Sequence, residues 1–155
     1  MKTKKLRVYA DTSVFGGYFD PEFSIESIGF FKRVKSGDLI LLLSDIVIAE
    51  INVAPGRVKE LMDSLSISQI EAIETTKEIL ELRNAYLKAG IIGPKWSNDA
   101  AHVASATINR ADAIVSWNFK HIVRLDKMKA YNQVNLAQGY GIITIITPKE
   151  VLTDD

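Results

Sequence analysis

The sequence contains no cysteine among its 155 residues. Neither disulfide bonds nor thiolate sites for zinc or iron–sulfur clusters can therefore hold the fold, and no thiol nucleophile is available. Any metal must be bound by oxygen or imidazole. No apolar run approaches the roughly 20 residues that a membrane-spanning helix needs, and the basic start is not followed by the apolar segment of a secretory signal. We expect a cytoplasmic protein without a membrane span.

The chain also lacks an excess of charge, since 19 basic residues balance 19 acidic ones. This balance removes the simplest compositional argument for a nucleic-acid partner. Basic residues nevertheless gather in two stretches, at 2–7 and at 120–129. Each stretch is either a phosphate-binding patch or a solvated face.

The distribution of apolar residues predicts strands and helices that alternate along the chain. Short runs rich in apolar residues indicate buried strands at 7–10, 39–43, 113–117 and 142–146. A loop is expected over 11–22, and helical spacing indicates helices over 24–35, 44–53, 55–65, 68–89, 97–111 and 124–137 and a short one from Pro148. The alternation predicts a single α/β domain over 1–155, with a mainly parallel central sheet and helices on both faces.

Polar residues follow the predicted strands at the edge where parallel α/β sheets bind their ligands. Asp11 and Asn118 directly follow strands, Glu50 lies on the helix after the second strand, and Asp99 opens a later helix. Carboxylates that converge in one crevice repel one another unless protons or cations neutralise them, which favours Mg²⁺ or Mn²⁺. Taken singly, each carboxylate has an ordinary alternative as a turn, helix-cap or surface residue.

Four segments make the chain resemble the PIN-domain family, which includes VapC-type toxins, across nearly its whole length. They are VYADTSVF near the start, SDIVIAEI around Glu50, NDAAHVASA around Asp99, and ADAIVSWNFKHI after it. The resemblance implies a parallel sheet flanked by helices and an acidic metal site at Asp11, Glu50, Asp99 and Asn118. The chain departs from the usual pattern at Asn118, where many relatives have a carboxylate, because an amide oxygen can bind a cation but adds no charge.

The function implied by this resemblance is that of a Mg²⁺- or Mn²⁺-dependent endoribonuclease. Asp11, Glu50 and Asp99 would be its catalytic residues, and the ions would activate water to hydrolyse phosphodiester bonds of single-stranded RNA. Lys120 and Arg124 come just after Asn118 and are the best-placed substrate contacts.

Three hydroxyl residues are supporting residues by the same resemblance. Thr12, Ser13 and Ser116 would orient metal ligands or waters, although hydroxyls at strand ends also commonly satisfy backbone groups. Relatives further imply an antitoxin protein as partner of a toxin, and commonly a homodimer. Exposed apolar residues in the helices around Phe30 and Ile48 would supply the dimer interface.

Four other residues have mainly structural interpretations. His102 lies three residues after Asp99 on the same helical face, where it is either a packed core histidine or a transition-metal ligand. His121 is either structural or a general acid or phosphate contact. Trp117 is expected in the core, and Asp112 at the opposite end of the sheet from the predicted site.

Two other classes of function remain open. A PIN-like fold whose metal site has decayed would serve as a nucleic-acid- or protein-binding module, as Asn118 and the neutral net charge suggest. A receiver domain or a haloacid-dehalogenase-type phosphatase also places an Asp after its first strand. Those phosphatases usually carry a second Asp two residues later, where this chain has Ser13.

Overall fold

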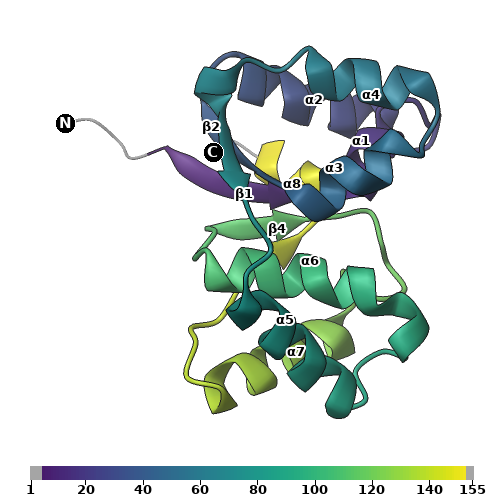
Figure 1. Ribbon diagram of the computed structural model, residues 1–155. Helices are drawn as coiled ribbons and strands as arrows, with labels where there is room; N and C mark the ends of the chain where they lie inside the picture. Colours follow the sequence, from purple (N-terminus) through teal and green to yellow (C-terminus); the bar gives the residue numbers. More distant parts are fainter. Residues whose placement is uncertain (1–4, 153–155) are drawn as a thin grey trace.

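A five-stranded parallel sheet lies between two layers of helices in the computed structural model, which describes residues 5–152 (Figure 1). The strands stand in the order β3-β2-β1-β4-β5, and every neighbouring pair is parallel. Their bounds are β1 Leu6–Ala10, β2 Leu39–Ser44, β3 Ile70–Ile73, β4 Ala113–Val115 and β5 Ile145–Ile146. The predicted parallel α/β architecture is confirmed. Both ends of the predicted domain 1–155, and with them Lys2 and Lys4 of the first basic stretch, lie outside the described residues.

Helices cover both faces of the sheet, as predicted. Helices α1, α2, α4 and α8 lie on one face and α5, α6 and α7 on the other, while α3 contacts helices of both groups (Figure 1). Their bounds are α1 Thr12–Gly17, α2 Ser24–Lys35, α3 Asp45–Asn52, α4 Gly56–Asp63, α5 Lys77–Lys88, α6 Ser97–Ile108, α7 Leu125–Ala137 and α8 Pro148–Leu152, with 3₁₀ turns η1 Ile67–Gln69 and η2 Pro94–Trp96. Over residues 5–152, every helix is too short or too polar to cross a lipid bilayer.

Capping residues explain where several helices begin and end. Ser44 begins α3 by accepting a hydrogen bond from the Val47 N–H (3.1 Å), as its position predicts. Thr76 caps α5 in the same way. Helix α2 ends just before Gly37, whose φ of +86° is a conformation that glycine adopts without strain.

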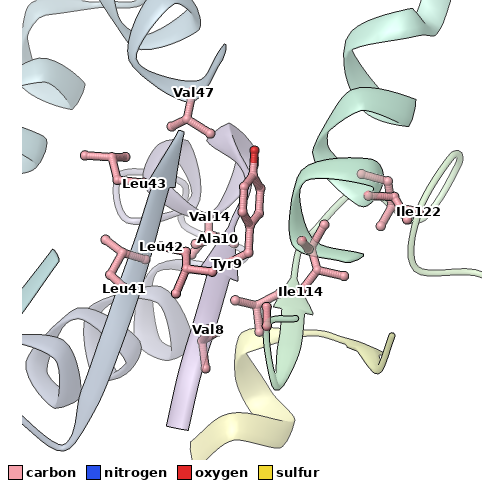
Figure 2. Close-up of a cluster of buried hydrophobic side chains, with 14 of the residues drawn as sticks. Val8, Tyr9, Ala10, Val14, Leu41, Leu42, Leu43, Val47, Ile114 and Ile122 are labelled. Atoms are coloured by element: carbon pink, nitrogen blue, oxygen red, sulfur yellow. The ribbon is translucent and has the colours of Figure 1, made fainter. Parts of the chain in front are cut away.

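The core is built around the central strand β1. Val8, Tyr9 and Ala10 are all buried, because helices cover both faces of this strand. Figure 2 shows the Tyr9 ring in this cluster, with its hydroxyl directed toward the end of the sheet at which Val47 lies. On α6, small residues such as Ala104 are fully buried, which lets this helix lie close to the sheet.

The predicted helix over 68–89 is wrong in its first part. Residues 67–73 form η1 and the edge strand β3, and the helix begins only at Lys77. The apolar spacing there does not distinguish a helix from a strand, and pairing with β2 decides it. The expected loop over 11–22 is also wrong, since α1 occupies its first half, while β4 and β5 are shorter than the predicted strands.

The dimer interface expected in the helices around Phe30 and Ile48 stays a prediction, and Phe30 itself takes no part in the surface. This side chain is fully buried in the core, where its ring packs edge-on against Phe31 with centroids 5.2 Å apart. Ile48 is only partly buried. The large exposed apolar residue of α2 is instead Ile25.

The close packing of α6 generates a stability prediction. Ala104→Leu should lower the free energy of unfolding by about 1–3 kcal/mol, because added methyl groups overpack a filled core. Ala137→Leu makes the same change at an exposed position of α7 and should stay within about 0.5 kcal/mol of the parent. Urea denaturation measures both variants, and equal stabilities would contradict the tight packing of α6.

Candidate active site

Three carboxylates from three different elements come together at the carboxyl end of the sheet. Asp11 follows β1, Glu50 lies on α3, and Asp99 lies in the first turn of α6. Glu50 and Asp99 line a cavity of about 630 Å³ together with Asn118. Asp11 is almost completely buried, at 3% exposure.

Two serine hydroxyls hold the buried Asp11 carboxylate. Ser13 donates to Asp11 Oδ1 (2.6 Å) and Ser116 donates to Asp11 Oδ2 (2.7 Å). Burial raises the pKa of Asp11, while the charge of His102 and the two serine hydrogen bonds lower it. Burial prevails, so the pKa lies above its ordinary value, and the nearby charge of Asp99 adds to this rise.

A chain of hydrogen bonds connects the core with Glu50. Ser44 Oγ lies 2.8 Å from the Tyr9 hydroxyl, which lies 2.7 Å from His102 Nδ1. The other ring nitrogen of His102, Nε2, bonds to Glu50 Oε1 (2.7 Å), and Thr12 donates to the same oxygen (2.5 Å). Glu50 is thus fixed by the core of the domain and not only by its own helix.

His102 is surrounded by negative charge. Its burial lowers its pKa, but the hydrogen bond to Glu50 and the charges of Asp11, Glu50 and Asp99 raise it above the ordinary value. Burial in turn raises the pKa of Glu50, whereas the hydrogen bond and charge of His102 lower it below its usual range. All three carboxylates therefore interact electrostatically with the same buried imidazole, that of His102.

A second histidine holds Asp99. His121 Nδ1 bonds to Asp99 Oδ2 (2.8 Å), and the His121 ring packs on Trp96 with centroids 4.6 Å apart. The sequence predicts mainly structural roles for both histidines and gives no local signal for Tyr9 or Trp96. The spacing of Asp99 and His102 was the available signal, since it places both on one face of α6.

Asn118 organises the segment after β4. Its side-chain oxygen accepts hydrogen bonds from the N–H groups of Lys120 (3.2 Å) and His121 (2.9 Å). The N–H groups of Trp117 and Asn118 donate to Ser13 Oγ and Ser116 Oγ, each at 2.9 Å. Asn118 lines the cavity, but this structure gives its oxygen a backbone-capping role, and metal binding by Asn118 stays a prediction.

The two predicted substrate contacts share the second of two cavities, and only Lys120 also lines the first. Lys120 lines both the first cavity and a second one of about 450 Å³. Arg124 lines only the second cavity, and its guanidinium pairs with the exposed Asp126 (2.8 and 3.0 Å). Asp112 lies away from these cavities, where it accepts a hydrogen bond from the Arg7 N–H (2.8 Å).

The donor set suits a hard divalent cation in its chemistry. Asp11, Glu50 and Asp99 offer the carboxylate oxygens that Mg²⁺ and Mn²⁺ prefer. Within residues 5–152, however, no three His, Asp or Glu side chains are grouped closely enough to form a ready metal site. Hydrogen bonds from His102 and His121 engage Glu50 and Asp99 instead. A cation bound here would have to compete with these two histidines.

Comparison with known proteins extends only to the fold. No protein-family model and no curated protein matches the sequence. A chain in the crystal structure of VapBC2 from Rickettsia felis, bound to a DNA fragment from their promoter, matches with a TM-score of 0.53 and 17% identity, over 74% of this chain and 90% of that chain. A chain of FitAcB from Neisseria gonorrhoeae matches with a TM-score of 0.53 and 13% identity, over 92% and 98%. These structures share the α/β fold described above.

Replacing His102 by Gln should flatten the dependence of stability on pH. The folded pKa of His102 is raised above its unfolded value of about 6.5, so its stabilising effect is complete below that pH and is lost as the pH rises through the folded pKa. We therefore expect the parent to lose more stability than His102→Gln as the pH rises from about 6 to about 9. Urea denaturation in EDTA measures the free energy of unfolding of both proteins as a function of pH. Parallel curves would contradict the raised pKa of His102.

Proposed function

We propose that the protein is a metal-dependent endoribonuclease of the PIN type that hydrolyses single-stranded RNA. The observation that carries this proposal is the convergence of Asp11, Glu50 and Asp99 from three elements at the carboxyl end of a parallel sheet. Such a concentration of negative charge beside a cavity is costly unless a cation neutralises it. The sequence motifs around all three residues support the same interpretation.

Asp11, Glu50 and Asp99 would hold one or two Mg²⁺ or Mn²⁺ ions. The bound ion would supply an activated water and neutralise charge on the leaving oxygen. The protein's own residues keep the ligands in place: Ser13 and Ser116 fix Asp11, and the hydrogen bonds described above fix Glu50 and Asp99. This pre-arrangement leaves few side-chain motions to be frozen when substrate binds.

Basic side chains would balance the charge of the RNA backbone. Lys95 and Lys120 stand in the lining of the acidic cavity, and Arg124 lies in the adjoining one. Phosphate contacts of this kind position a nucleic acid without reading its sequence. We accordingly assign Lys120 and Arg124 to substrate binding.

A protein partner is part of the proposal. The sequence resembles a family that includes VapC-type toxins, and the fold is similar to chains of VapBC2 and FitAcB. We propose that this chain acts as a toxin whose activity an antitoxin protein blocks. A homodimer is also proposed, on the resemblance alone.

A binding module without catalysis is the second candidate function. It is favoured by one observation: His102 and His121 already form hydrogen bonds with the Glu50 and Asp99 oxygens that a cation would need. A module of this kind would bind RNA equally in EDTA and in Mg²⁺ and would cleave nothing. The nuclease requires divalent ions for cleavage, so the same assay separates the two candidates.

Asp99→Asn should lower RNA cleavage by on the order of 100-fold or more, since even indirect changes at metal sites cost roughly 10–100-fold. The change removes one charge from a partly exposed side chain, so the fold should persist. The matched control is Asp38→Asn, an exposed position before β2 at the other end of the sheet, which should cleave like the parent. Cleavage of a labelled oligoribonucleotide in Mg²⁺, Mn²⁺ and EDTA measures this. Undiminished cleavage by folded Asp99→Asn, or by the parent in EDTA, would contradict the proposed metal site.

Asn118→Asp should reduce the Mg²⁺ concentration needed for half-maximal cleavage. A carboxylate keeps the oxygen that caps the backbone and adds a charge beside the proposed cation. In EDTA the same charge should lower the melting temperature by repelling the other carboxylates. Asn84→Asp adds a charge at an exposed position of α5 and should change neither quantity. If Mg²⁺ titrations of Asn118→Asp match those of the parent, residue 118 lies outside the metal site.

A further inference from the structure

One large aromatic side chain stands partly exposed beside the acidic cavity. Trp96 ends the turn η2, three residues before Asp99, and 38% of its surface is exposed. Pro94 begins this turn, and the Trp96 N–H donates to the Gly93 carbonyl oxygen (2.9 Å). The proline and this hydrogen bond therefore restrain the backbone that carries the indole.

The indole lies where the two cavities meet. Trp96, Lys120 and His121 line both of them. His121 packs on the indole and also bonds to Asp99. A group that binds on Trp96 is therefore only one side chain, that of His121, away from the acidic cluster.

Cations surround the same indole. Lys95 Nζ lies 5.2 Å and Lys120 Nζ 5.5 Å from the centroid of the Trp96 ring system, and both lysines are exposed. The second cavity adds Arg124 and Lys127, and its lining, as far as the structure describes it, contains no acidic residue. Across the indole, the charged side chains of the surface thus change from carboxylates mixed with lysines to basic groups alone.

We propose that an unpaired RNA base stacks on Trp96. Lys95, Lys120 and the second cavity would bind the phosphates on one side of that base. The inference rests on the proposed function and adds to it a base-binding subsite that places the neighbouring phosphodiester in the acidic cavity. A base can lie on an aromatic side chain only when it has left a base-paired stack, so this subsite selects single-stranded RNA. The exposed ends of the lysines can move aside for the base and contact its phosphates.

Substitution of Trp96 tests the stacking. Trp96→Ala should weaken binding of a single-stranded oligouridylate by on the order of 10-fold, the usual effect of losing one base–aromatic contact. Fluorescence anisotropy in EDTA measures this binding without metal-dependent cleavage. Trp96→Phe keeps a ring and should retain most of the affinity, while losing the quenching of intrinsic tryptophan fluorescence that RNA causes in the parent.

An abasic chain of the same length separates stacking from a purely structural role. The parent should bind the oligouridylate on the order of 10-fold more tightly than the abasic chain, and Trp96→Ala should bind both alike. The matched control is Phe119→Ala, which removes an exposed aromatic ring that lines neither cavity and should keep the preference. Equal losses for both ligands in Trp96→Ala, absence of the preference in the parent, or its loss in Phe119→Ala would overturn the inference.

The outcome is independent of whether the protein is a nuclease. Base-dependent binding through Trp96 by a protein that cleaves no RNA would refute the proposed function and leave the stacking subsite in place. Cleavage by a parent whose binding is insensitive to Trp96→Ala would refute the subsite and leave the nuclease.

Discussion

The burial of the Asp11 carboxylate is the constraint on which the arrangement of this site depends. A carboxylate loses its hydration when it is buried in the interior. Hydrogen bonds and opposite charge from the protein must compensate for that loss. Ser13 from α1, Ser116 after β4 and the charge of His102 on α6 provide this compensation. One buried group thereby specifies how three other segments of the chain meet at the end of β1.

Histidine plays an unusual part in this acidic cluster. Imidazoles contact Glu50 and Asp99, and His102 is in turn supported by Tyr9 in the core. Hydrogen bonds with the two histidines thus orient two of the three carboxylates. The fold itself therefore sets the positions of the carboxylates. Cations and protons compete for the same carboxylate oxygens.

The sequence allowed most of the architecture to be predicted, because buried parallel strands and capped helices leave local patterns. The residues Asp11, Glu50 and Asp99 could be proposed from their places after strands and in motifs. Two features could not be predicted, for different reasons. Strand β3 has a spacing that also suits a helix, so only its pairing with β2 identifies it. The bond from Tyr9 to His102 joins residues distant in sequence, and no local pattern signals such a contact.

The segment between β4 and α7 has little regular secondary structure, yet its backbone is extensively hydrogen-bonded. The N–H groups of Trp117 and His121 donate to side chains, and those of Ile122 and Val123 donate to the Asn118 carbonyl oxygen. Loops usually open before the core does, and exchange their amide hydrogens quickly. These amides should instead exchange as slowly as those of the sheet. A protease should find no cleavable site here until the whole domain unfolds.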